Sequence, residues 1–389
     1  MWRFLANERV TLPHLAAPLM EAAREGVSSS CDEYALAVHD WSRVAFRTHK
    51  SKRDIKQLSH ETDAGYDLAT RLIVSDRSGE PIAAPVQSLV TSEGLWTSRE
   101  AGFRREVLPH LDELTVSMAW LEAQDFGKPL VHMIDREADS TAHWRQWHAT
   151  GQLWLTRIKG GSRLAWQGQS LAASAIAEAL PFQYARDVVI RGMPARQLVA
   201  ETTVRIAREA KPKRKNAQGK RVAPVRGEAL TARLIVSRVE DAQGNRLAVW
   251  YLLSNVGETV AAERLALWYY WRWNIESFFK LMKQAGHHLE SWEQETGLAI
   301  FKRLLIASQA CVNVWRLMRS TTPEAKETCA FLVRLSGRQM KRRCPITASA
   351  MLDGLFKLLT LLETLETHSI HDLRSFAYTA LYGSHKMEA

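Results

Sequence analysis

Residues 269–283 read YYWRWNIESFFKLMK, in which one acidic side chain, Glu276, stands among aromatic and basic side chains. On an α-helix, with about 100° between successive residues, the stretch separates into two faces. The polar face holds Tyr269, Arg272, Glu276, Lys280 and Lys283. The opposite face, which we expect to pack on the core, holds Trp271, Ile275, Phe278, Leu281 and Met282.

The polar face has two interpretations that the helix alone does not separate. Arg272, Glu276 and Lys280 are four residues apart, so they fit ion pairs on a solvated surface, each worth about 0.2–0.5 kcal/mol. In the second interpretation, Glu276 joins carboxylates from elsewhere in the chain to bind a cation. The basic side chains, Lys280 among them, would then bind phosphates.

Two further acids follow segments with strand patterns. YALAV (34–38) predicts a buried strand that ends at Asp40, before Trp41 and Ser42, and PLVHMI (129–134) predicts a strand that ends at Asp135. An aspartate at a strand end is also a common cap, so neither acid is specific by itself. Together with Glu276 they form a set of hard oxygen ligands that suits Mg²⁺ or Mn²⁺. Two such ions support in-line displacement at a phosphodiester.

Composition indicates a globular protein with a polyanionic partner. The 389 residues are 46% hydrophobic and 24% charged, which is enough for two or three domains with a sizeable core. Lys and Arg outnumber Asp and Glu by 52 to 42, and the charge of +10 favours nucleic acid or an acidic membrane surface. The four cysteines lack disulfide or zinc spacing, and we expect a soluble, non-secreted protein of the cytoplasm.

The remaining patterns give an order of α/β, then β-rich, then helical. An antiparallel hairpin is expected over 69–90 with its turn at Gly79, and a helix is expected from Leu111 to Leu121. Short strand patterns fill about 160–254, and helical patterns fill about 258–319 and 346–366. His287 and His288 lack a third ligand at metal spacing, so we expect no second metal site there.

The segment KPKRKNAQGKRVAPVR (211–226) holds seven Lys or Arg and no acid, with Pro and Gly between them. These features predict an exposed loop that includes Lys213, Arg214 and Lys215. It fits a clamp on the DNA backbone and equally a plain solvated loop.

MIDREAD (133–139) and the pattern Tyr269-x2-Arg272-x3-Glu276-x6-Lys283 resemble bacterial cut-and-paste DDE transposases of the insertion-sequence-four type. The resemblance covers roughly residues 1–320. It implies an α/β fold with a ribonuclease-H-like core, a mixed sheet flanked by helices, that a β-rich insertion interrupts. The implied domains are a remnant of an N-terminal helical region (1–30), the first part of the core (31–159), the insertion (160–256), the helical part of the core with the signature (257–320) and a helical C-terminal dimerisation region (321–389).

The resemblance also implies roles for individual residues. Asp40, Asp135 and Glu276 would be catalytic and would bind two Mg²⁺ or Mn²⁺ ions. Tyr269, Arg272 and Lys283 would contact DNA phosphates near the transposon end. Trp250 would stack on a flipped base, although an inward-facing strand aromatic fits it equally well.

The function that the resemblance implies is metal-dependent cleavage of transposon ends and strand transfer into target DNA. The chain would act as a homodimer on paired ends, in the nucleoid of a bacterial cytoplasm. Similar proteins carry a helical end-recognition region ahead of a stretch like WRFLAN (2–7), whereas 39 residues precede Asp40 here. This difference motivates an alternative to the active enzyme, namely a shortened, non-catalytic derivative that inhibits the full-length protein, or an inactive remnant. A general ribonuclease-H-like nuclease is a third possibility.

The leucines of the C-terminal region permit two interpretations. They follow a helical spacing that fits a dimerisation helix and equally a plain core helix. These leucines are Leu355, Leu358, Leu359, Leu362 and Leu365.

Overall fold

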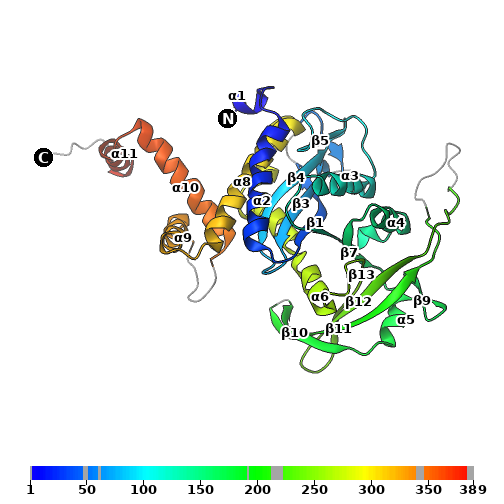
Figure 1. Ribbon diagram of the computed structural model, residues 1–389. Coiled ribbons are helices and arrows are strands. Elements are labelled where there is room, and N and C mark those ends of the chain that lie inside the picture. The colour runs from blue at the N-terminus through cyan, green and yellow to red at the C-terminus, as the bar shows by residue number, and fades with distance from the viewer. Residues whose placement is uncertain are drawn as a thin grey trace.

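A computed structural model describes residues 2–46, 51–59, 63–190, 192–211, 222–338 and 346–382. In this part of the chain 13 strands form one mixed sheet, with helices on both of its faces (Figure 1). The prediction of a mixed α/β fold is confirmed.

The described strands follow the predicted order of a first group, a β-rich middle part and a helical remainder. They are β1 (Ala35–Ala45), β2 (Lys56–Gln57), β3 (Ala64–Ser75), β4 (Pro81–Val90), β5 (Leu95–Thr97), β6 (Leu130–Ile134), β7 (Leu153–Ile158), β8 (Arg163–Trp166), β9 (Gln169–Ala172), β10 (Gln183–Ile190), β11 (Met193–Ile206), β12 (Leu230–Glu240) and β13 (Arg246–Ser254).

The helices lie mostly at the two ends of the chain. They are α1 (Trp2–Ala6), α2 (Leu12–Ser30), α3 (His110–Glu122), α4 (Thr141–Ala149), α5 (Ala173–Glu178), α6 (Ala262–Trp271), α7 (Asn274–Lys280), α8 (Gly297–Arg319), α9 (Pro323–Ser336), α10 (Ala348–Thr367) and α11 (Ile370–Tyr382), with short turns η1 (Arg136–Ala138), η2 (Leu281–Ala285) and η3 (Leu289–Ser291).

The central strand β1 joins an antiparallel part of the sheet to a parallel part. It pairs antiparallel with β3 along its whole length, and parallel with β6 only as far as the pair His39 and Ile134. The prediction that the strand ends at Asp40 is wrong, because β3 continues to pair with β1 beyond this residue, through its residues Ala69 to Gly65. Trp41 and Ser42 therefore continue the strand.

The predicted hairpin is present as β3 and β4. Gly79 lies in its turn with φ of +74°, a conformation that suits glycine. A Cβ at this position would lie 2.4 Å from the ring of Trp271. The turn thus packs closely on α6, which begins the segment with the sequence signature.

The β-rich middle part does not form a sheet of its own. β13 pairs antiparallel with β7, and β12 and β11 extend the same ladder outward. The sheet order is β5-β4-β3-β1-β6-β7-β13-β12-β11-β8-β9, with β10 on β11 and β2 on β3. The strands near the signature and the strands of the middle part are therefore held by one hydrogen-bonded network.

Apolar side chains fill both faces of the sheet. α2 and α8 pack side by side on β4, and their cluster includes Leu19, Leu72 and Phe301 (Figure 1). α3 and α4 cover the other face, where Trp144 and Trp154 are fully buried. α8 has the length and hydropathy of a membrane span, but most of its apolar stretch is buried in the protein, as in a core helix.

The C-terminal helices project from the body of the molecule (Figure 1). α10 packs on α9 at its start, where Gly354 lies against the backbone of Leu332. Leu355 and Leu358 are partly buried against the core, whereas Leu359 is 52% exposed. Leu362 and Leu365 are also exposed, so the core-helix interpretation is wrong for the second half of α10.

Candidate active site

Asp40 and Asp135 lie next to each other where the parallel pairing of β1 and β6 stops. Asp40 follows His39 on β1, and Asp135 follows Ile134, the β6 residue that pairs with His39. The Asp135 carboxylate accepts the backbone N–H of Glu137 at 2.7 Å and so starts the η1 turn. Burial raises the pKa of Asp40, the charge of Arg272 opposes this effect, and the nearby Asp135 raises the pKa further.

The signature segment is two helices, so the prediction of a single helix with a polar and an apolar face is wrong. α6 ends at Trp271 and α7 begins at Asn274. Between them, the N–H groups of Arg272 and Trp273 each bond to the carbonyl three residues earlier, which tightens the backbone into a turn.

This turn directs Arg272 into the protein, towards β1. Its guanidinium donates to Asp40 Oδ2 at 3.0 Å and to Glu276 Oε1 at 3.2 Å. The expected ion pair between Arg272 and Glu276 is therefore present, but it is part of a larger arrangement with Asp40. We call the set Asp40, Arg272 and Glu276 the Arg272 bridge.

Tyr269 and Trp250 lie together beside the Arg272 bridge. Tyr269 is buried, and its ring lies 5.8 Å from the guanidinium carbon of Arg272. The ring centre of Trp250, on β13, is 6.0 Å from that of Tyr269 and 6.4 Å from that of Tyr270. Trp250 is partly buried in this aromatic group, in agreement with an inward-facing strand residue, and it is also close to the signature residues.

Lys280 and Lys283, of which only Lys283 belongs to the signature, have different surroundings. Lys280 is exposed at the end of α7. Lys283 is partly buried, donates to the carbonyl oxygen of Arg43 on β1, and lies 3.9 Å from the carboxylate of Glu290. Burial lowers the pKa of Lys283, and Glu290 acts in the opposite direction. Lys283 thus ties the end of the signature segment to the strand that carries Asp40.

The other acids of MIDREAD make contacts that the sequence did not predict. The exposed Glu137 bonds to His110 Nδ1 at 2.8 Å. Asp139 accepts bonds from the Lys159 N–H at 3.2 Å, from the Ser162 hydroxyl and from Arg208 at 2.5 Å. Asp139 therefore connects the loop after β6 to the β-rich strands. In the sequence, only the alternating acids of MIDREAD marked Asp139 as a residue of interest.

The three acids have the chemistry of divalent-metal ligands but are not arranged as a metal centre in this structure. Carboxylate oxygens suit Mg²⁺ and Mn²⁺. However, no group of three or more His, Cys, Asp or Glu residues within the described ranges lies close enough together to hold a metal ion. The guanidinium of Arg272 lies between Asp40 and Glu276 and provides the positive charge there.

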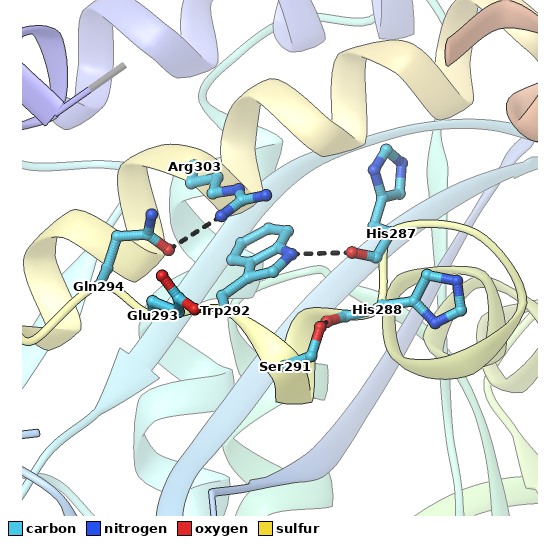
Figure 2. A pocket seen from close by; sticks show the side chains of 7 residues that line it. All are labelled: His287, His288, Ser291, Trp292, Glu293, Gln294 and Arg303. Atoms are coloured by element: carbon cyan, nitrogen blue, oxygen red, sulfur yellow. Dashed lines mark hydrogen bonds between the residues drawn. The ribbon is translucent and has the colours of Figure 1, made fainter. Parts of the chain in front are cut away.

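A cavity of about 590 Å³ follows the signature segment but does not include the acids (Figure 2). Arg303 lies over the ring of Trp292 at 4.2 Å and bonds to Gln294, and His287 accepts the Trp292 indole N–H at 2.8 Å through its carbonyl oxygen. Figure 2 shows the imidazoles of His287 and His288 turned in different directions. Burial lowers the pKa of His287 to about 4.

Lys213, Arg214 and Lys215 lie outside the described residues. The chain on either side of this segment is described, and there Ala210 and Val225 exchange two backbone hydrogen bonds of 2.9 and 2.8 Å. Residues 210 and 225 are thus held side by side at the edge of the β-rich part.

Comparison with known proteins identifies one family. A sequence model described as "Transposase DDE domain" matches residues 113–312, a range that contains Asp135 and Glu276 and begins after Asp40. Among solved structures, the chain is similar to one described as "Cryo-EM structure of piggyBac transposase synaptic complex with hairpin DNA (SNHP)", with 8% identity and a TM-score of 0.38. The similarity covers 89% of this chain and 56% of that chain. None of the curated proteins matches.

Proposed function

The chain belongs to the transposase DDE domain family, and on this premise we propose that it cleaves transposon ends and transfers the strands into target DNA. The observation that supports the proposal is that Asp40, Asp135 and Glu276, from three distant parts of the chain, all act electrostatically on the one buried side chain of Arg272. Arg272 links Asp40 directly to Glu276, and Asp135 acts electrostatically on Asp40. A surface ion pair between Arg272 and Glu276 alone would not require Asp40 and Asp135 beside it.

We also propose the insertion-sequence-four type with the Tyr-Arg-Glu-Lys signature. Tyr269, Arg272 and Glu276 are close to one another, and Lys283 is tied to β1. The order β4-β3-β1-β6-β7, antiparallel as far as β1 and parallel beyond it, supports a ribonuclease-H-like core. Strands β8 to β13 would be its insertion.

Asp40, Asp135 and Glu276 would supply oxygen ligands for Mg²⁺ or Mn²⁺, most simply two ions. Such ions activate the attacking oxygen and stabilise the leaving one in phosphodiester chemistry. Arg272, Lys280 and Lys283 would bind the phosphates of DNA, with Tyr269 at the same surface. Trp250 would stack on an unpaired base. The positive net charge supports a DNA partner, in the bacterial nucleoid.

The test is cleavage of DNA that carries the inverted-repeat ends of the element, in Mg²⁺ or Mn²⁺. We expect Asp135→Asn and Glu276→Gln each to reduce nicking about 100-fold or more, because each removes one charged oxygen ligand. Glu137→Gln is the matched control, because this exposed acid lies two residues after Asp135 and pairs with His110.

Three results would contradict the proposal. Nicking that survives in Asp135→Asn or Glu276→Gln would exclude these acids as ligands. Equal cutting of DNA with and without the inverted repeats would identify a general nuclease instead. Tight binding of the ends without cleavage in either metal would favour the inhibitory derivative.

A further inference from the structure

The Arg272 bridge places a buried cation between two acids that the proposed function assigns to metal binding. The Arg272 side chain is only 8% exposed, and its two Nη atoms bond to Asp40 and Glu276. A metal ion that binds these acids needs the same oxygens and, like Arg272, compensates their negative charge. Arg272 and the ion therefore compete for Asp40 Oδ2 and Glu276 Oε1.

A DNA phosphate is the natural partner that could take Arg272 away from the acids. A phosphate accepts two parallel N–H bonds from a guanidinium, as a carboxylate does. Its negative charge would replace the charges of Asp40 and Glu276 as the partner of Arg272. Arg272 Nε is buried without a hydrogen-bond partner among the described residues, so the guanidinium has a donor to spare.

The surroundings of Arg272 permit such a movement. Arg272 lies in the turn between α6 and α7, outside the regular part of either helix. Its guanidinium carbon is 5.9 Å from the ring of Trp273, which is 51% exposed. The side of Arg272 that faces Trp273 is therefore next to solvent, where a DNA backbone would arrive.

We propose that Arg272 couples DNA binding to metal binding. In the DNA-free protein Arg272 is hydrogen-bonded to Asp40 and Glu276, and this weakens the binding of the metal ion to these acids. When a DNA phosphate binds the guanidinium, the two carboxylates become available to the metal. Because linkage is reciprocal, the metal strengthens DNA binding by the same factor. This inference rests on the proposed assignment of Asp40 and Glu276 as ligands, and it makes metal binding conditional on the substrate.

The test measures Mn²⁺ binding from the electron paramagnetic resonance signal of the unbound ion, with and without a short end duplex at saturation. We expect the wild type to bind Mn²⁺ about tenfold more tightly with DNA, after subtraction of binding to DNA alone. Arg272→Gln should bind Mn²⁺ about tenfold more tightly than the wild type without DNA, and DNA should then add less than about twofold. Arg272→Lys keeps the positive charge but loses the planar pair of N–H donors, so its affinity for Mn²⁺ without DNA should lie between those of the wild type and Arg272→Gln.

Arg264→Gln is the matched control. Arg264 lies on α6, eight residues before Arg272. It also contacts two carboxylates, Asp76 at 3.2 Å and Asp32 at 3.7 Å, away from the site. Its loss should leave Mn²⁺ binding as in the wild type. Asp40→Asn in the Arg272→Gln background should abolish the added affinity, because it removes the oxygen that Arg272 covers.

The coupling proposal is overturned if Arg272→Gln folds, as judged by its circular dichroism and melting temperature, and binds Mn²⁺ no more tightly than the wild type. If Arg272→Gln does not fold, the same comparison of Mn²⁺ affinity with the wild type is made for Arg272→Lys. The proposal is also overturned if the added Mn²⁺ affinity of Arg272→Gln persists when Asp40→Asn is combined with it. Failure of the proposed function is seen separately, as nicking that survives Glu276→Gln.

Discussion

At the scale of single residues, two buried arginines near β1 differ in how their charge is compensated. Arg71 is 1% exposed, and its guanidinium nitrogens have no hydrogen-bond partner among the described residues. Burial lowers the pKa of Arg71 to about 9, although Glu113 acts in the opposite direction. Arg99, by contrast, is paired directly with the buried carboxylate of Glu113. A buried charge is costly unless it is paired.

We therefore predict that Arg71→Met raises the free energy of unfolding by about 1–3 kcal/mol at pH 7, measured by urea denaturation. The pKa of Arg71 is lower in the folded state than in the unfolded state, so the cost of its charge is complete below pH 9 and is relieved only as the pH rises above 9. Arg99→Met should instead lower the free energy of unfolding by about 3 kcal/mol, because the buried Glu113 would lose its buried partner and keep only Arg104, at 3.1 Å. Destabilisation by Arg71→Met would mean that its attraction to Glu113 outweighs the cost of burial.

The sequence predicted the identity of the site acids better than their immediate contacts. Asp135 follows a strand as the apolar run before it indicated, and it lies beside Asp40. Arg272 was expected to face outward to phosphates, whereas it bonds to Asp40, 232 positions away. Helical periodicity describes neighbours along one helix, so it contains no information on a partner that a distant strand supplies.

At the scale of elements, the loop after β6 is held to the β-rich strands by Asp139. Its side chain is 9% exposed and contacts Arg208 and Ser162. The position of Asp135, four residues earlier, depends on the same loop. The anchor therefore links the shape of the candidate site to the middle part of the sheet.

Asp139→Ala should lower the free energy of unfolding by about 3 kcal/mol, because it leaves Arg208 and the Lys159 N–H without this acceptor. Chemical denaturation monitored by circular dichroism measures the change. Glu137→Ala is the comparison, since this half-exposed acid should cost less than about 1 kcal/mol. Equal losses in the two variants would show that Asp139 is no special anchor.

Element boundaries were predictable where the local pattern was strong. Alternating and apolar runs gave the hairpin of β3 and β4 and the strands β7 and β13. The extension of β1 past Asp40 was missed, because pairing with β3 holds Trp41 and Ser42 in the sheet although the apolar run has ended. The turn at Arg272 and Trp273 was missed as well, since no Gly or Pro marks it.

At the scale of the whole molecule, the C-terminal helices present apolar side chains that the other described residues leave exposed. Besides the leucines of α10, the exposed side chains on α11 include Ile370, Phe376 and Leu381. Apolar surface of this kind marks interaction sites in soluble proteins. The exposed apolar surface supports the homodimer that the resemblance to transposases implies. The helical spacing of the leucines alone did not separate a dimerisation helix from a core helix.

Sedimentation velocity should find the wild type as a dimer at about 10 µM, and Leu362→Glu with Leu365→Glu should shift it to monomer, because charges would be buried at the contact. Val189→Glu is the control, since Val189 is similarly exposed but lies on β10, in the β-rich part. A dimer that persists with both leucines replaced would exclude this face of α10.

The pairing of β13 with β7 has a consequence for amide hydrogen exchange. Strands that share one ladder open together, because each loses its partner when its neighbour separates. The amides of β12 and β13 should therefore exchange at rates close to those of β6 and β7, as one cooperative unit. Asp135 follows β6 and Trp250 lies on β13, so both belong to this slowly opening unit. The turn between α6 and α7, which carries Arg272, lies outside this ladder, so its amides should exchange faster than those of the unit.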